Sequence, residues 1–144
     1  MIKRISELDL QNIIEIERES FDNPWTIEQI HHDILEKKVS NNWGYYKNTH
    51  LIGYIFGWIV QDEYHLTNIA IKTEFKRQGI ASSLLNFLLE LLRKRQIKHI
   101  FLEVSNANQS AQRLYERIDF ISVGIRKDYY GKGDDAILYT LELE

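Results

Sequence analysis

The sequence predicts one α/β domain, spanning residues 1–144, built on a mixed and mostly antiparallel sheet. Short segments rich in aromatic and β-branched residues alternate with segments of helical period, which is typical of α/β architecture. The last two strand-like segments flank Gly131-Lys132-Gly133, a composition typical of a hairpin turn. One proline and seven glycines leave no stretch that resembles a linker, so we expect a single domain.

The N-terminal part predicts one short strand and two helices. The strand covers Ile2 to Ile5, and Ser6 then provides a cap for a helix with acidic residues in its first turn. The break at Asn23-Pro24-Trp25 ends this helix, whose stripe is formed by Leu10, Ile13, Ile14 and Glu17. Thr26-Ile27-Glu28-Gln29 has the spacing of a capping box and starts a second helix, which we expect to run to about Lys37.

The middle of the chain predicts three neighbouring strands. Trp43 to Lys47 and Leu51 to Val60 are separated by a short polar gap, which indicates a hairpin. Tyr64 to Ile71 follows as the third strand. Its residues Leu66, Asn68 and Ala70 alternate with Thr67, Ile69 and Ile71, so we expect both faces to be at least partly covered.

The C-terminal half predicts two helices, one strand and the closing hairpin. After a loop from Lys72 to Gln78, a helix extends from Gly79 to about Arg95, with an apolar stripe made by Ile80, Leu84, Leu88, Leu91 and Leu92. The remaining expected elements are a strand from His99 to Val104, a helix from Asn108 to about Arg117, and hairpin strands from Ile121 to Tyr129 and from Ala136 to Leu143.

Composition excludes several classes of function. The 18 basic and 21 acidic residues give a net charge of −3, which argues against broad nucleic-acid binding. The chain has no cysteine, and its five histidines show no metal-ligand spacing, so we expect no metal site. The longest apolar run, Leu51 to Val60, is about half of the roughly 20 residues that span a bilayer, and no secretory signal is visible. We therefore expect a cytoplasmic protein with no membrane segment.

The first candidate site is the segment between the third predicted strand and the long helix. It reads Lys76-Arg77-Gln78-Gly79-Ile80-Ala81-Ser82. The free N–H groups of a helix's first turn, with basic side chains beside them, suit a pyrophosphate. One glycine makes neither a Walker loop nor a Rossmann fingerprint, and an ordinary solvated turn explains the segment equally well.

The second candidate group consists of Glu103, Asn108 and Tyr115. Glu103 lies near the end of a predicted strand, and Asn108 and Tyr115 share one face of the next helix because they are seven residues apart. Each has an ordinary alternative: a solvent-facing strand residue for Glu103, a helix N-cap for Asn108 and a core tyrosine for Tyr115.

Taken together, Arg-Gln-Gly-Ile-Ala after a strand, then Glu103, Asn108 and Tyr115-Glu116-Arg117-Ile118-Asp119-Phe120, resemble the GNAT superfamily of N-acetyltransferases over essentially the whole chain. Further strings are similar to its ribosomal-protein-alanine N-acetyltransferases: Glu19-Ser20-Phe21, Pro24-Trp25-Thr26, Asn68-Ile69-Ala70-Ile71, Leu102-Glu103-Val104 and Arg126-Lys127-Asp128-Tyr129-Tyr130. Two residues depart from the family pattern. Lys76 replaces Arg or Gln, and Asp119 replaces a glycine at what we expect to be a left-handed helix end.

The resemblance implies a GNAT fold, with about seven strands and about four helices, and acetyl-CoA as the cosubstrate. Its arm is expected along Ile69, Ala70 and Ile71, with the Ile71 N–H polarising the thioester carbonyl. The pyrophosphate is expected on Arg77, Gln78, Gly79, Ile80, Ala81 and Ser82, and Asn108 is expected to contact the arm. The resemblance also implies Glu103 as the base and Tyr115 as the acid.

The function that this resemblance implies is acetyl transfer to the N-terminal α-amine of a protein, a ribosomal protein that starts with alanine. Trp25 and Tyr130 are candidates for acceptor contacts, with simple aromatic packing as their alternative. We expect direct attack in a ternary complex by a monomer or weak dimer. The open alternatives are an acetyltransferase for a small amine or a lysine side chain, and a non-catalytic module that binds CoA.

Overall fold

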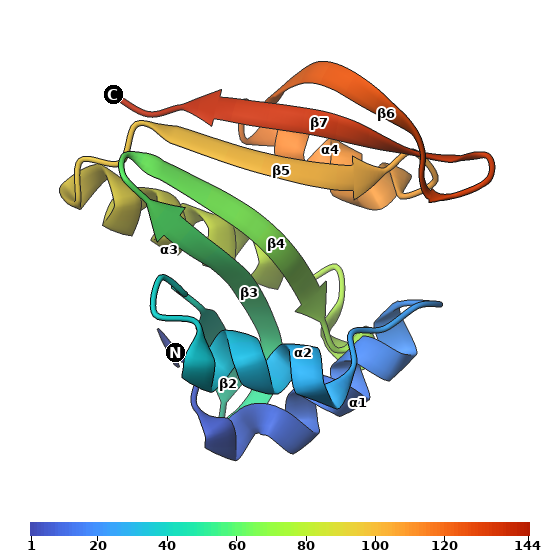
Figure 1. Ribbon diagram of the computed structural model, residues 1–144. Coiled ribbons are helices and arrows are strands. Elements are labelled where there is room, and N and C mark those ends of the chain that lie inside the picture. The colour runs from blue at the N-terminus through green and yellow to red at the C-terminus, as the bar shows by residue number, and fades with distance from the viewer.

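The computed structural model describes all residues from 1 to 144 and contains one seven-stranded sheet in the order β1-β2-β3-β4-β5-β7-β6 (Figure 1). Only β4 and β5 are parallel, and every other neighbouring pair is antiparallel. The predicted mixed, mostly antiparallel sheet is therefore confirmed. The strands are β1 (Ile2–Arg4), β2 (Trp43–Lys47), β3 (His50–Val60), β4 (Glu63–Ile71), β5 (His99–Ser105), β6 (Ile121–Gly131) and β7 (Asp134–Glu142).

Four α-helices cover the two faces of the sheet, as Figure 1 shows. Helices α3 (Ile80–Lys94) and α4 (Gln109–Arg117) lie behind it, whereas α1 (Leu10–Ser20) and α2 (Ile27–His31) lie in front of its lower half. The larger hydrophobic cluster forms under α3 and includes Leu84, Leu88 and Leu92, each fully buried. None of these helices combines the length and the apolar character that crossing a bilayer requires.

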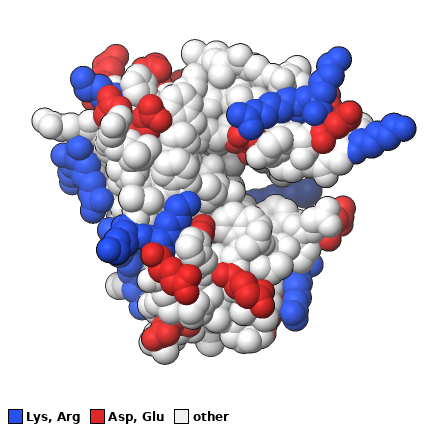
Figure 2. Space-filling view, in the orientation of Figure 1, with Lys and Arg blue, Asp and Glu red and all other residues white.

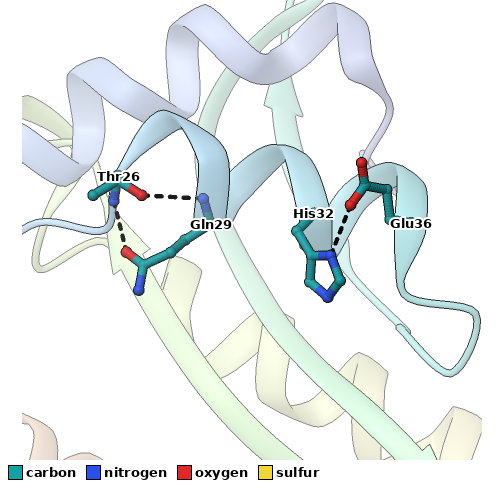
Figure 3. Close-up of polar contacts among 4 residues, drawn as sticks. All are labelled: Thr26, Gln29, His32 and Glu36. Atoms are coloured by element: carbon teal, nitrogen blue, oxygen red, sulfur yellow. Dashed lines mark hydrogen bonds and ion pairs between the residues drawn. The ribbon is translucent and has the colours of Figure 1, made fainter.

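The predicted capping box at α2 is confirmed. The Gln29 N–H donates to Thr26 Oγ1 at 3.1 Å, and the Thr26 N–H donates to Gln29 Oε1 at 2.8 Å (Figure 3). The single helix expected to reach Lys37 is wrong, because α2 ends at His31 and a π-helical turn follows from His32 to Glu36. The Lys37 N–H bonds the His32 carbonyl at 2.9 Å, which closes this wider turn.

A β-bulge in β4 changes which side chains share a face. Phe56 of β3 pairs with Asn68, but the next residue, Gly57, pairs with Leu66, so Thr67 is the extra residue. Leu66 packs in the cluster under α3, whereas Ala70 packs in the cluster against α1. Both faces are covered as expected, but the predicted alternation that placed Leu66 and Ala70 on one face is wrong.

Strands β4 and β5 pair at one end and then separate. Their parallel register runs from Glu63 opposite His99 to Leu66 opposite Leu102, and no pair follows. In Figure 1 the two strands visibly diverge beyond this point, towards the loop that leads into α3. The sheet therefore opens directly after the β4 bulge, at the level of Glu103.

Candidate active site

The diverging part of β4 presents backbone groups that β5 does not take up. The Lys72 N–H donates to the Ile52 carbonyl of β3 at 2.7 Å. Because alternate residues of a strand direct their N–H groups to opposite edges, the N–H groups of Ile69 and Ile71 point away from β3. They therefore face the opening between β4 and β5, where the family resemblance predicts the acetyl-CoA arm.

Backbone donors also gather at the start of α3. None of the six N–H groups from residue 77 to residue 82 donates a hydrogen bond within the chain, and the first α3 bond of this region is Ser83 N–H to the Gly79 carbonyl at 2.9 Å. Gly79 has φ +79° and a Cβ built on it would meet nothing within 4 Å. Arg77 is also left-handed, with φ +63°. This open row of donors is a suitable cradle for a pyrophosphate.

Glu103 lies on the β5 side of the opening. Its Oε1 atom is 3.5 Å from a guanidinium nitrogen of Arg126 on β6, whereas its Oε2 atom is buried and has no hydrogen-bond partner. The side chain as a whole is 29% exposed. A buried carboxylate oxygen without a donor is costly, which distinguishes Glu103 from an ordinary surface residue. Its role as the base stays a prediction.

Tyr115 on α4 is buried, being 3% exposed, and its ring lies 5.6 Å from that of Phe120. The helix end fixes this arrangement, because the Phe120 N–H bonds the Tyr115 carbonyl at 3.0 Å and Asp119 adopts φ +76°. The predicted left-handed position of Asp119 is thereby confirmed. Burial, and to a smaller extent Tyr130, raises the pKa of the Tyr115 hydroxyl far above its ordinary value, so this group keeps its proton at neutral pH.

Tyr130, at the end of β6, links these two groups. Loss of hydration and the nearby Glu103 carboxylate raise its pKa to about 12. Tyr130 in turn contributes to the raised pKa of Tyr115. Glu103, Tyr115 and Tyr130, from β5, α4 and β6, therefore influence one another's charge.

Figure 2 shows the surface hollowed on the right, between the lobe built by β5, β6 and β7 and the lobe built by α1 and α2. A Lys or Arg side chain is visible at the back of this hollow.

The family model of the acetyltransferase (GNAT) family matches residues 10–120 of this chain, more than half of its length. The chain belongs to the GNAT family. It is an acetyl-CoA-dependent N-acetyltransferase, and the resemblance seen in the sequence is confirmed.

Two relatives and one solved structure resemble this GNAT chain closely. It is 37% identical over 131 residues to a putative ribosomal protein bS18-alanine N-acetyltransferase of Bacillus subtilis, covering 90% of this chain and 87% of that protein. It is 30% identical over 145 residues to the Escherichia coli K12 ribosomal protein bS18-alanine N-acetyltransferase, covering 99% and 97%. The crystal structure of a ribosomal-protein-alanine N-acetyltransferase from Escherichia coli superposes with a TM-score of 0.93 at 28% identity, covering 100% and 94%.

Two further predicted GNAT site residues have local roles in the fold. Asn108 is the N-cap of α4, where its Oδ1 accepts the Ala111 N–H at 3.1 Å. Its local capping role is therefore confirmed, and its contact with acetyl-CoA stays a prediction. Trp25 lies in the segment between α1 and α2, partly buried, with its ring edge-on to Phe56 at 5.7 Å. Its aromatic packing is present, and its contact with the acceptor stays a prediction.

Sequence reasoning assigned no role to two residues near this site. Arg126 reaches Glu103 only because of the irregular register between β6 and β7, which the sequence does not reveal. Glu17 is 1% exposed and binds groups on three other segments. A signal for Glu17 existed, because it stands within the apolar stripe of α1, four residues after Ile13 and three after Ile14.

Proposed function

We propose that this enzyme transfers the acetyl group of acetyl-CoA to the N-terminal α-amine of a ribosomal protein that begins with alanine. The observation that carries the proposal is the unpaired Oε2 atom of Glu103, buried at the point where β4 and β5 separate. The names of the relatives from Bacillus subtilis and Escherichia coli support the choice of acceptor. A ribosomal acceptor supports a cytoplasmic location for the enzyme.

In the proposed reaction, bound acetyl-CoA supplies the acetyl group as an activated thioester, and the chain's own groups hold and move protons. The N–H groups of residues 77–82 hold the pyrophosphate. The Ile71 N–H donates a hydrogen bond to the oxygen on which negative charge develops. The Glu103 carboxylate accepts the proton that the attacking amine loses, and the protonated Tyr115 hydroxyl donates a proton to the leaving group.

Proton energetics favour an α-amine as the acceptor. With an ordinary pKa of about 8, an α-amine costs about 1.4 kcal/mol to deprotonate at pH 7, whereas a lysine amine with a pKa of about 10.4 costs about 4.6 kcal/mol. Glu103 is a single carboxylate that already lies beside the Arg126 guanidinium, so it suits the less costly deprotonation, that of the α-amine. A lysine or small-amine acceptor remains the second candidate, because burial lowers the pKa of an amine.

The test is acetyl transfer to a panel of acceptors, read by thiol release and by the mass of the product. The panel contains a peptide that begins with alanine and carries one lysine, the same peptide with a blocked N-terminus, and a small primary amine. We expect acetylation of the free N-terminus alone. Acetylation of the blocked peptide would assign the enzyme to lysine side chains, and acetyl-CoA binding without any turnover would favour a binding module.

A further inference from the structure

Glu17 is a buried carboxylate that the proposed reaction does not use. It lies on the sheet-facing side of α1 and is 1% exposed, among the buried residues Ile13, Ile14 and Ile16. An ionised carboxylate in such surroundings is costly unless it is fully hydrogen-bonded.

Three donors from three segments satisfy this carboxylate. Glu17 Oε1 accepts the backbone N–H of Trp25 at 2.9 Å. Glu17 Oε2 accepts both the Tyr54 hydroxyl of β3 and the Asn68 side-chain amide of β4, the latter at 2.6 Å. One side chain therefore ties the segment between α1 and α2 to two strands of the sheet.

Two partners of Glu17 belong to β4 and to the α1–α2 segment. Asn68 is the first residue after the β4 bulge, within the part of β4 that no longer pairs with β5. Trp25 stands in the α1–α2 segment, and its ring packs against Phe56, the residue that pairs with Asn68. Glu17 therefore connects β4, the strand beside the proposed reacting groups, to the α1–α2 segment, which we expect to contact the acceptor.

Loss of Glu17 would affect β4 and the α1–α2 segment unequally. Strand β4 keeps its pairing with β3 from Phe56–Asn68 to Gly53–Ile71, and the Lys72 N–H still bonds the Ile52 carbonyl. The hydrogen bond to Glu17 is the single one that the Trp25 backbone makes. The α1–α2 segment therefore depends on Glu17 more than β4 does.

We propose that Glu17 is a positioning residue that fixes the α1–α2 segment against the diverging part of β4 and thereby shapes the entrance for the acceptor peptide. It touches none of the reacting atoms and acts through Trp25 and Asn68. This inference rests on the proposed function in one respect, that the acceptor enters beside Trp25. The pyrophosphate cradle at residues 77–82 makes no hydrogen bond with Glu17, and Ile69 to Ile71 keep their pairing with β3 without it, so we expect acetyl-CoA binding to change little.

The decisive variant is Glu17→Gln, which keeps the shape of the side chain but replaces one acceptor oxygen with an NH2 donor. The variant removes the negative charge from this acceptor. Either the Trp25 N–H then faces an NH2 donor, or the Tyr54 hydroxyl and the Asn68 amide must turn to accept from it. We expect the KM for the alanine peptide to rise about 10-fold, while the KM for acetyl-CoA stays within about twofold. Ile16→Val, in the same helix and the same cluster, is the matched control and should lower only the melting temperature.

A second measurement needs no acceptor. Amide hydrogen exchange of residues 21–26 should rise in Glu17→Gln and stay at the wild-type rate in Ile16→Val. An unchanged acceptor KM, with only kcat or the melting temperature reduced, would show a purely structural role, and so would unchanged exchange in residues 21–26. If the wild type acetylates a different amine, the proposed function fails, and the KM comparison is then made with that amine.

Discussion

Leu66 and Leu102 form the last pair between β4 and β5, and Glu103 follows Leu102 directly. The carboxylate therefore lies at the first position where β5 no longer has β4 as its neighbour. Its Oε2 atom is buried without a donor, while Oε1 is close to Arg126. The separation of the strands and the position of the proposed base are thus one feature of the fold.

The first prediction concerns this carboxylate. Glu103→Gln should lower kcat about 100-fold to 10,000-fold near pH 7, the usual effect of removing a general base. Part of the activity should return as the pH rises towards 9, because a larger fraction of the acceptor α-amine is then neutral. A pH–rate profile with the alanine peptide measures both effects. Full activity of Glu103→Gln from pH 6 to 9 would show that the base lies elsewhere.

The second prediction concerns Tyr115. Tyr115→Phe should lower kcat without recovery at higher pH, because the leaving group still departs without a proton donor. Burial raises the pKa of the wild-type hydroxyl, so its protonated form persists beyond the ordinary pKa of about 10, and wild-type activity should show no loss from its ionisation below that pH. Acetyl-CoA affinity, measured by calorimetry, should stay close to that of the wild type. An equal recovery in both variants would contradict the assigned roles.

Local features of this fold follow from short stretches of sequence. The capping box of Thr26 and Gln29 and the N-cap at Asn108 are read from residues three positions apart. The left-handed Asp119 is predictable because it occupies the place of a glycine at a helix end. The residues of the pyrophosphate cradle are predictable for a similar reason, since the strand, the glycine and the helix start are contiguous.

Features that depend on cross-strand register were beyond sequence reasoning. The bulge at Thr67 lies next to the place where the Tyr64 ring covers Gly57. A Cβ added at Gly57 would come within 2.2 Å of that ring. Nothing in the local sequence of β4 indicates this contact. The meeting of Arg126 with Glu103 likewise depends on the irregularities of β6, and the three partners of Glu17 lie 8 to 51 residues away from it along the chain.

The third prediction concerns the pyrophosphate cradle. Ala81→Ile places a bulky side chain in the first turn of α3, and Gly79→Ala strains a residue with φ +79°, so both should weaken acetyl-CoA binding strongly. Arg77→Ala should weaken it modestly, and that loss should shrink as salt is added. Titration calorimetry at two salt concentrations measures these affinities. Wild-type affinity in folded Ala81→Ile would place the pyrophosphate elsewhere.

The fourth prediction concerns the acceptor contacts. Tyr130→Ala should raise the KM for the alanine peptide without changing the KM for acetyl-CoA, because Tyr130 lies beside Glu103 on the exposed hairpin. Trp25→Ala should raise the same KM and also lower the melting temperature, since its ring packs on Phe56. Lys132→Ala, at the turn of the same hairpin, is the control for Tyr130. Equal acceptor KM values in all three variants would leave aromatic packing as the only role of these side chains.

The last prediction concerns stability in alkali. Burial, followed by the Glu17 carboxylate, raises the pKa of Tyr54 well above its ordinary value, and burial alone does so for Tyr64. Both hydroxyls are bonded inside the fold, Tyr54 to Glu17 and Tyr64 to the Asn41 carbonyl at 3.0 Å. In the unfolded chain these groups ionise near pH 10, so their contribution to stability is fully present below that pH and falls as the pH rises through the folded-state values.

Each such tyrosine should reduce the free energy of unfolding by about 1.4 kcal/mol per pH unit above pH 10. Urea denaturation at several pH values measures the slope, and absorbance at the tyrosinate band reports ionisation. Tyrosinate from these two residues should form only as the protein unfolds. Tyr64→Phe should remove the contribution of one tyrosine, about 1.4 kcal/mol per pH unit, from the slope of the unfolding free energy against pH. Ionisation of all eight tyrosines near pH 10 in a protein that stays folded would contradict the burial of Tyr54 and Tyr64, and with it the closed core that supports β3 and β4.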